Sequence, residues 1–439
     1  MTEPARPANS ESARPALTPN RRTFLKASAA AVAAPTIVPA SVFAKNGQPA
    51  PSDRVIVGSI GVGDLGRRHH LAGKLIPNKR IQMAAVCDVD RDHRDQAALD
   101  VLNRTGKKVD IYKDFRDLCD RQDIDAVLIA TPDHWHALTS IYAMESGKDV
   151  YCEKPLTLTI DEGKKMVEVA RRYGTIFQTG SQQRSDKRFR QACELVRNGK
   201  IGKLQTVDTY IGDIDSGSWQ PVTTPPANLD WNFWLGPAPY ADYSPNRCHY
   251  QFRWFSDYSG GKMTDWGAHH NDIAQWGIGA DGSGPVKVVG SGEFYENGPH
   301  DVPGTFDVTY TYANGVTLTC HAKGENGVKF TGADGWIFVS RGKIEASNPD
   351  ILKIELTDSD VRLYDSHDHH TNWLDCIHSR KLPICDIEVG HRSVTICHLG
   401  NIAIKLGREL NWDPAKEVFV GDEQAQRLCS KPMRAPWHL

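Results

Sequence analysis

The sequence predicts an α/β fold in which a parallel sheet with helices on both faces is followed by a larger, mostly antiparallel sheet. Two changes of pattern carry this prediction. Between Val55 and about Pro155, continuous apolar runs alternate with amphipathic helical patterns, which is typical of a parallel sheet. Beyond Lys203, apolar and polar residues alternate with a period of two, which is typical of antiparallel strands with one buried face.

In the first half, strands and helices are expected to follow one another. The expected strands are Val55–Ile60, Ile81–Cys87, Ala126–Thr131, Asp149–Cys152 and Ile176–Thr179. The expected helices are Gly66–Leu75, Arg91–Arg104, Phe115–Arg121, Ala137–Ser146, Asp161–Tyr173 and Arg188–Arg197. Asn198-Gly199 is a stop signal for the last of these helices, because both residues tolerate the conformation that ends helices.

The second half is expected to form the larger sheet. Its expected strands are Leu204–Ile211, Val286–Phe294, Thr305–Tyr312, Val316–His321, Gly335–Ser340, Lys343–Ala346 and Ile351–Leu356, with helices at Thr371–Ser379 and Ser393–Leu406. The tryptophan- and proline-rich segment from Trp219 to Trp254 is expected to form a long loop over the functional site, since loops of such length are usually functional or disordered. We therefore expect one domain at 52–175, a second at 176–415 and a tail at 416–439.

The composition is that of an ordinary soluble globular protein. The chain has 439 residues, of which 40% are hydrophobic and 24% charged, and this length suggests about two to three domains. A formal net charge of −2, without a basic block interleaved with aromatics, argues against nucleic acid or an anionic membrane as the main partner. The ten cysteines form no C-x-x-C pair, so we expect mostly buried free thiols rather than a zinc knuckle or a redox site, and a disulfide in the exported protein is the alternative.

The N-terminus has the pattern of a twin-arginine export signal. Residues 1 to about 20 are too rich in Pro, Ala, Ser and Glu to order themselves, and Arg21-Arg22 precedes a small-residue apolar run from Ala27 to Phe43. That run is too alanine-rich and proline-broken for a membrane span. Cleavage after Ala44 would remove residues 1–44 and leave a periplasmic or otherwise exported protein. The alternative is an accidental arginine pair before a hydrophobic helix.

A glycine-rich loop follows the first expected strand. Gly61, Gly63 and Gly66 have the spacing G-x-G-x-x-G, which suits a tight turn, a close approach of backbone to a pyrophosphate, and close packing of the next helix. Asp88 follows the second expected strand, where an acidic residue should accept from an adenosine ribose. The pattern predicts a dinucleotide site, and the carboxylate favours NAD over NADP. The alternative is a glycine-rich surface turn.

Three segments lie at the carboxyl ends of the expected parallel strands. They are Gly61–Gly66, Thr131–His136 and Glu153–Pro155. Ligands of doubly wound sheets bind at these ends, so this coincidence is the main argument for a catalytic site there. A protein that folds around a cytoplasmic nucleotide would also have to be exported already folded, which agrees with the twin-arginine signal.

The glycine loop, Glu153-Lys154-Pro155 and the segment Gly260–Asp272 together resemble the Gfo/Idh/MocA family of nicotinamide-dependent oxidoreductases, over about residues 53 to 415. The resemblance implies an N-terminal Rossmann domain and a C-terminal domain whose open sheet carries the substrate and often mediates oligomers. It also implies oxidation or reduction of a secondary hydroxyl on a sugar, a cyclitol or a related derivative. We therefore expect a homo-oligomer with a small carbohydrate substrate.

Carried over residue by residue, the resemblance makes Lys154, Asp265 and His269 the catalytic group. His269 would be the general acid/base, because a neutral imidazole near pH 7 suits removal of a hydroxyl proton. Lys154 would orient the hydroxyl and stabilise alkoxide charge, and Asp265 would position substrate or lysine. The residues expected to bind the cofactor are Gly61, Gly63, Asp64, Leu65, Gly66, Asp88, Thr131, Pro132, His136, Glu153, Lys154 and Gln182. Those expected at the substrate are Arg184, Asp265, His269 and His270.

Each assignment has a structural alternative. Lys154 could be a solvated loop lysine, Asp265 a helix cap, and His270 rather than His269 the histidine of the site. Arg184 could grip a carboxylate or a pair of sugar hydroxyls, or it could form a surface salt bridge. Trp135, at a strand end, could stack on a ligand or simply pack.

A metal site and two other functions are alternative interpretations of the sequence. The run His367–His370 is rich in metal-ligand side chains, but ligands crowded in one loop cannot all face one ion, so we expect no metal. Relatives of the resembled family hydrolyse glycosides with the help of NAD, by transient oxidation and elimination, and this is the alternative to a dehydrogenase. A non-catalytic sugar-binding protein on the same scaffold is the third possibility.

Overall fold

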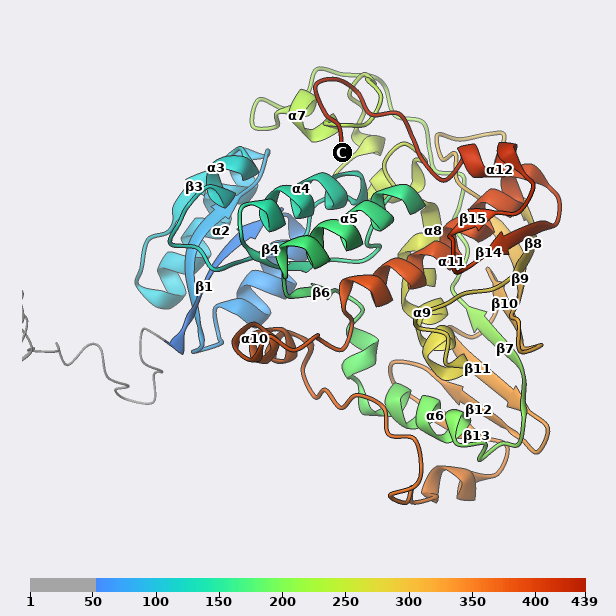
Figure 1. Cartoon of the computed structure of the whole chain (residues 1–439). Helices are drawn as coiled ribbons and strands as arrows, with labels where there is room; N and C mark the ends of the chain where they lie inside the picture. Colours follow the sequence, from blue (N-terminus) through green and yellow to red (C-terminus); the bar gives the residue numbers. More distant parts are fainter. Residues whose placement is uncertain (1–52) are drawn as a thin grey trace, which may run out of the picture. The chain divides into compact units, whose positions relative to one another are not determined.

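The computed structural model describes residues 53–439, which contain two β-sheets joined by helices (Figure 1). The expected signal region, residues 1–44, lies outside the described residues. The predicted fold class is confirmed, because a parallel sheet comes first and a larger, mostly antiparallel sheet follows. Within the described part of the chain, no helix has the length and hydropathy that a membrane span needs.

The first sheet has six strands in the order β3-β2-β1-β4-β5-β6, and every pair is parallel. Its strands are β1 Val55–Ile60, β2 Ile81–Cys87, β3 Asp110–Tyr112, β4 Ala126–Ile129, β5 Asp149–Cys152 and β6 Phe177–Thr179. This order is that of a dinucleotide-binding fold, and its direction reverses between β1 and β4. Since β6 pairs with β5, the first sheet extends beyond the boundary that we predicted at residue 175.

Helices cover both faces of this sheet. On one face the buried residues of a wide π-helix, α2 and α10 pack against β1, β4 and β5, and on the other face α3, α4 and α5 do so. The bounds are Leu65–Leu75 for the π-helix, α2 Arg91–Thr105, α3 Phe115–Cys119, α4 Asp133–Glu145, α5 Ile160–Tyr173 and α10 His369–Ser379. Thus α10, which comes late in the chain, covers the first sheet, as its position beside the first sheet in Figure 1 shows.

The second sheet has nine strands in the order β13-β12-β11-β7-β10-β9-β8-β14-β15. All pairs are antiparallel except β7 with β10. The strands are β7 Leu204–Tyr210, β8 Lys287–Glu293, β9 Thr305–Thr311, β10 Thr317–His321, β11 Gly327–Gly332, β12 Trp336–Val339, β13 Ile344–Ala346, β14 Leu410–Asp413 and β15 Val418–Phe419. Burial alternates along β9 and β10, so one face of this sheet packs inward.

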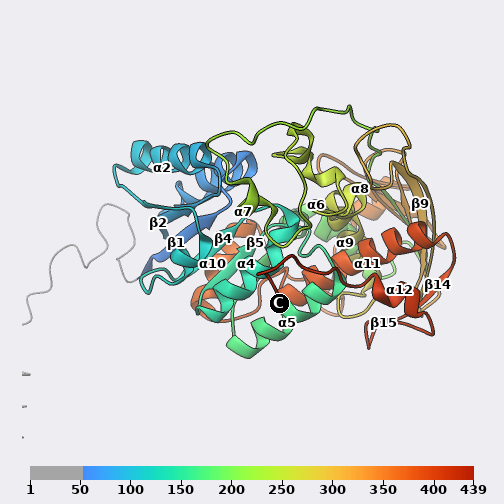
Figure 2. The same ribbon diagram turned by 90° about the horizontal axis from the view of Figure 1, so that it is seen from above.

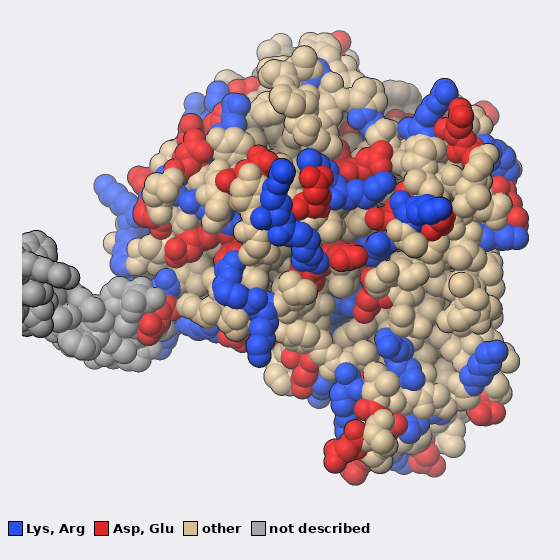
Figure 3. Space-filling model, in the orientation of Figure 1, with Lys and Arg blue, Asp and Glu red and all other residues tan. Residues whose placement is uncertain are grey.

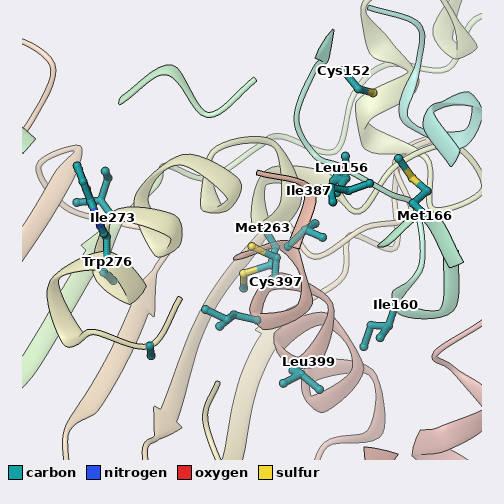
Figure 4. Packing of buried hydrophobic residues seen from close by; sticks show 14 of the residues in the cluster. Cys152, Leu156, Ile160, Met166, Met263, Ile273, Trp276, Ile387, Cys397 and Leu399 are labelled. Atoms are coloured by element: carbon teal, nitrogen blue, oxygen red, sulfur yellow. The ribbon is translucent and has the colours of Figure 1, made fainter. Parts of the chain in front are cut away.

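The remaining helices connect the two sheets. They are α6 Lys187–Arg197, α7 Trp231–Leu235, α8 Gly261–Asp265, α9 Gly267–Ile278, α11 Ile387–Leu406 and α12 Glu423–Arg427. Single 3₁₀ turns lie at Gln182–Ser185, Pro245–Arg247, Gln251–Trp254 and Pro349–Lys353. Helix α11 contacts both α5 and β8, and Figure 2 shows it between α5 and the second sheet. One continuous apolar cluster, part of which is drawn in Figure 4, therefore runs from the first sheet to the second.

Three expectations need correction. Ile351–Leu356 is not a strand, because Pro349 has no N–H for a sheet ladder and Asn348 caps a 3₁₀ turn there instead. Helix α4 begins at Asp133 rather than Ala137, with Pro132 as its N-cap, so His136 lies within this helix rather than before it. The predicted tail 416–439 carries β15 and α12, and Trp437 packs edge-on against Trp135.

The surface and the cysteines agree with the composition. On the face drawn in Figure 3, acidic and basic side chains are interspersed rather than gathered by sign. All ten cysteines are buried free thiols, as expected. Residues 54–439 form one compact unit.

Candidate active site

A cavity of about 390 Å³ opens at the carboxyl ends of the first sheet, where the strand order reverses between β1 and β4. Its walls include eleven of the residues predicted for the site: Gly61, Gly63, Asp64, Leu65, Gly66, Asp88, Thr131, Pro132, Glu153, Lys154 and Asp265. These residues come from the ends of β1, β2, β4 and β5 and from α8. The structure thus brings most of the predicted groups to one place.

The three loop glycines have distinct geometries. Gly61 has φ +77°, and a Cβ there would lie 2.7 Å from the backbone of Ala130. A Cβ on Gly66 would lie 2.0 Å from the carbonyl oxygen of Gly61, so only glycine lets the helix start so close to the strand. A Cβ on Gly63 would meet only the His93 ring, at 3.5 Å, which leaves the cradle in front of Gly63 open to a ligand.

The polar groups around this cradle fit a dinucleotide. Asp88 accepts hydrogen bonds from the backbone of Val62 at 2.9 Å and of Asp90 at 2.9 Å, so its carboxylate is fixed at the end of β2. The hydroxyl of Thr131 is buried and has no hydrogen-bond partner among residues 53–439. An open cradle, a fixed carboxylate and an unpaired hydroxyl are what a bound nucleotide would use.

The segment 228–250 of the second half packs over the Asp88 end of the cavity and is hydrogen-bonded to residues 89–91 there. Leu229 forms a bridge with Asp90, and the backbone N–H groups of Arg91 and Asp230 donate across the same junction. The His249 ring lies 3.1 Å from the Asp90 carboxylate. The hydrogen bonds to His249 and Asn228 overcome burial and lower the pKa of Asp90. This segment, which we call the strap, confirms that the predicted Trp219–Trp254 region covers the site.

The strap also brings Asp90, His93 and His249 together, with possible ligand atoms within 4.8 Å of one another. Asp90 already caps α2, however, and accepts from Asn228 at 2.8 Å. The contacts between the strap and the start of α2 therefore explain why these three side chains lie together.

Lys154 and Asp265 form an ion pair between the two halves of the chain. The Lys154 ammonium donates to the Asp265 carboxylate at 2.7 Å and to the Asp265 carbonyl at 3.0 Å. Burial alone would raise the pKa of Asp265, but the charges of Lys154 and Arg253 outweigh it and lower that pKa. Asp265 is the last residue of α8 and does not cap a helix N-terminus, which excludes the capping alternative.

His269 and His270 follow in α9 and are both buried, but their surroundings differ. The His270 ring nitrogens contact Gln183 at 3.3 Å and Asn326 at 3.0 Å, whereas His269 Nδ1 has no hydrogen-bond partner in the described chain. Burial, then the charges of Lys154 and Arg341, lower the pKa of His269 well below its ordinary value. His269 is therefore a neutral imidazole with an unused ring nitrogen.

Glu153 is held from behind by two buried histidines. The His70 ring lies 3.0 Å from the Glu153 carboxylate and 3.0 Å from the His370 ring. Burial would raise the pKa of Glu153, but the contact with His70 and the charge of Lys154 together outweigh burial and lower that pKa to about 2. His370 belongs to the predicted histidine run, and its neighbour His369 contacts Ser185 and the Thr179 carbonyl through its ring nitrogens.

Three other predicted residues lie elsewhere than expected. Arg184 is buried away from the cavity, where it pairs with Asp272 and Asp281 at 2.8 Å each, so it does not grip substrate. Its partners lie 88 and 97 positions away, which no local pattern reveals. His136 spans the carbonyls of Pro155 and Thr131 at 2.7 and 2.9 Å and joins two site loops. Gln182 lies outside the cavity wall, and its buried side-chain oxygen has no partner in residues 53–439.

Trp135 and two arginines complete the surroundings. Trp135 is buried among Phe115, Phe233 and Trp437 and donates to the Trp234 carbonyl at 2.9 Å, so packing accounts for it. Sequence reasoning missed Arg253, which lies 3.7 Å from Asp265 and lines the cavity. It also missed Arg341, whose guanidinium lies over the Trp266 ring at 4.5 Å.

Comparison with known proteins agrees with this geometry. Residues 55–181 match the NAD-binding Rossmann fold of an oxidoreductase family, and residues 215–439 match the C-terminal α/β domain of the same family. The chain belongs to the Gfo/Idh/MocA family of oxidoreductases. The predicted resemblance is thus confirmed, and the first sheet belongs to an NAD-binding Rossmann domain.

Individual Gfo/Idh/MocA relatives have low sequence identity to this chain. A "Glycosyl hydrolase family 109 protein" of Shewanella baltica is 32% identical over 209 residues, which is 42% of this chain and 44% of that protein. The match therefore spans less than half of the relative. Solved structures include myo-inositol 2-dehydrogenase from Lactobacillus plantarum, at 24% identity and TM-score 0.59, and an aldose-aldose oxidoreductase from Caulobacter crescentus, at 18% and 0.62. Each match covers 82% of this chain and 99% of the solved chain, and it shows that the two proteins share a fold.

The predicted export signal is also confirmed. Residues 18–37 match the twin-arginine translocation signal sequence, so this Gfo/Idh/MocA protein is exported through the twin-arginine machinery to the periplasm.

Proposed function

We propose that this protein is an NAD-dependent dehydrogenase that acts on a secondary hydroxyl of a sugar, a cyclitol or a related carbohydrate. The observation that carries the proposal is the Lys154–Asp265 pair, which lines the same cavity as the glycine loop. Bound NAD would supply the acceptor for the hydride that leaves the carbon of the substrate. The hydroxyl proton must leave at the same time, so the overall change gives a ketone, reduced nucleotide and one proton.

Three side chains divide the proton chemistry. Lys154 donates a hydrogen bond to the hydroxyl oxygen and stabilises the negative charge that develops there. Asp265 fixes the position of the Lys154 ammonium through the 2.7 Å contact. His269 takes the hydroxyl proton on a ring nitrogen, and its depressed pKa supports this role because the base must start neutral.

The Asp88 carboxylate supports NAD rather than NADP, because it accepts from a ribose hydroxyl and repels a 2′-phosphate. The strap supports a nucleotide that stays bound between turnovers, since it is fastened across the Asp88 end of the cavity. A retained nucleotide would be reduced by one substrate and reoxidised by another. We also propose a homo-oligomer, in keeping with the open nine-stranded sheet.

The test uses a Lys154→Met variant, which removes the ammonium and nearly conserves the volume. The purified variant should retain its nucleotide, measured after denaturation, while reduction of that nucleotide by a competent sugar falls about 100- to 1,000-fold. The matched control is Lys329→Met, which removes a lysine on β11 that lies over the Trp336 ring. Unchanged reduction by Lys154→Met would reject the role of Lys154.

A second candidate function is glycoside hydrolysis assisted by NAD, and the named glycosyl hydrolase relative favours it. In that reaction a ring hydroxyl is oxidised, the aglycone is eliminated, water adds and the ketone is reduced again, so no nucleotide is consumed. A chromogenic glycoside separates the two functions. Release of the aglycone without net reduced nucleotide supports hydrolysis, and stoichiometric reduction without release supports the dehydrogenase.

A further inference from the structure

Arg341 is a cation of the second domain that the proposed chemistry does not use. It lies in the link between β12 and β13, and its guanidinium lies over the ring of Trp266, which directly follows Asp265. Its Nε donates to the side-chain oxygen of Gln183 at 3.2 Å, and Gln183 in turn contacts His270. The ring contact and this hydrogen bond hold the guanidinium in one orientation.

The surroundings of Arg341 include the carboxylates of the site but no direct partner. Arg341 forms no ion pair within residues 53–439, and its contacts there are the hydrogen bond to Gln183 and the Trp266 ring. Although the residue is exposed, enough protein surrounds its guanidinium to lower its pKa, and the charges of Asp265 and Glu153 oppose this effect. The two terminal nitrogens of the guanidinium therefore lie near the reaction centre without a protein acceptor.

The cations of this region differ in how the protein neutralises them. Lys154 and Arg253 lie close to the Asp265 carboxylate, and both also interact with the buried Asp133. Arg341 interacts with Asp265 and Glu153 only at longer range and forms no ion pair in the described part of the chain. Of these three cations, Arg341 is therefore the one that no adjacent carboxylate neutralises.

Arg341 does not belong to the nucleotide cradle. It is absent from the walls of the cavity that contains the glycine loop, whereas Lys154 and Arg253 line that cavity. Arg341 instead lies over Trp266, the residue that links Asp265 at the end of α8 to the start of α9. This is the side of the cleft that the substrate must occupy if Lys154 and His269 act on its hydroxyl.

We propose that Arg341 binds an anionic group of the substrate, so that the protein acts on an acidic sugar rather than a neutral one. The two terminal nitrogens present a planar fork that matches a carboxylate, as in a uronic or aldonic acid. A sugar phosphate carries the same chemistry and is a second source of the anion. The inference rests on the proposed function and narrows its substrate class.

The test measures binding separately from turnover, with the purified enzyme and its own nucleotide. Calorimetric titration compares D-glucuronate with D-glucose, D-galacturonate with D-galactose, and D-glucose 6-phosphate with both. The uronates should bind at least about tenfold more tightly than the neutral sugars, as expected for a charge-assisted hydrogen bond. Tighter binding of the phosphate than of the uronate would also support the inference and assign the anion to a phosphate.

Two variants of Arg341 and one control variant test whether Arg341 causes the preference for acidic sugars. Arg341→Gln should remove the preference for the acids and leave the affinity for neutral sugars within about twofold, while Arg341→Lys should keep part of the preference because it keeps the charge. Arg362→Gln, an exposed arginine of the same domain whose guanidinium donates to the Leu356 carbonyl, should change nothing. Equal affinity of the natural protein for glucuronate and glucose, or a preference that survives Arg341→Gln, would overturn the inference.

Measurement of turnover distinguishes failure of the acidic-substrate inference from failure of the proposed dehydrogenase function. If neutral sugars reduce the bound nucleotide and bind as well as the acids, the dehydrogenase stands and the acidic substrate class is wrong. If the acids bind through Arg341 but no sugar reduces the nucleotide, the binding site stands and the dehydrogenase proposal fails.

Discussion

The two walls of the cleft differ in how the chain builds them. The nucleotide wall, which comprises Gly61–Gly66 and Asp88, comes from one βαβ unit, so its geometry follows from local backbone constraints. The substrate wall, by which we mean Lys154, Arg253 and Asp265 of the cavity lining together with His269 and Arg341 outside it, is collected from four distant segments and is held by ion pairs and stacking. The comparison teaches that binding of the cofactor and chemistry on the substrate should respond to different substitutions.

The largest effect is expected on the substrate wall, from His269→Gln. This change removes the neutral base, so kcat should fall about 10²- to 10⁴-fold while the nucleotide content stays unchanged. His270→Gln is the matched control, because that ring contacts Gln183 and Asn326 rather than offering a free nitrogen. Single-turnover reduction of the bound nucleotide measures both variants, and an equal loss of rate in the two would contradict the choice of His269.

On the nucleotide wall, Gly63→Ala should weaken nucleotide binding about 10- to 100-fold, since overpacking a site by one methyl group costs about 1–3 kcal/mol. The fold should tolerate this change, because the new methyl would meet only the His93 ring at 3.5 Å. Gly66→Ala is the contrast, since its methyl would lie 2.0 Å from the Gly61 oxygen and should lower the Tm as well. Nucleotide content and thermal melting measure the pair; a melting loss in Gly63→Ala as large as in Gly66→Ala would show that the cradle is not open.

A smaller effect is expected for Asp88→Asn. The amide keeps one acceptor for the Val62 N–H but loses the charge, so affinity for NAD should fall about tenfold and discrimination against NADP should narrow. Reconstitution of nucleotide-free protein with each nucleotide measures the ratio of the affinities for NAD and NADP. An unchanged ratio would mean that another group selects the cofactor.

The smallest effect is expected from pH. The pKa of His269 lies well below its ordinary value of 6.5, so the ring stays in its neutral, base-competent form on lowering the pH to 6.5. We therefore expect kcat/KM to change less than about twofold between pH 6.5 and about pH 8. A steep loss of rate near pH 6.5 would show that an ordinary histidine, rather than His269, acts as the base.

The same contrast explains what sequence reasoning achieved. The glycine loop, Asp88 and the strands β1, β2 and β5 could be predicted because each depends on residues next to it in the chain. Arg184 was misjudged as a substrate residue because its partners, Asp272 and Asp281, come from a distant helix and loop. Arg253 and Arg341 could not be singled out, since nothing in their local sequence shows that folding carries them to Asp265 and Trp266.

Helix α10 has a consequence for how the protein is made. Its Trp373 and Leu374 are fully buried against β1, β4 and β5, yet they are synthesised some 200 residues after the last strand of that sheet. Until the ribosome releases this helix, the part of that face which the π-helix and α2 leave uncovered is bare and apolar, so a shortened N-terminal fragment should be insoluble rather than a working module. Translation must therefore run almost to its end before the molecule becomes fit for a translocase that carries folded cargo.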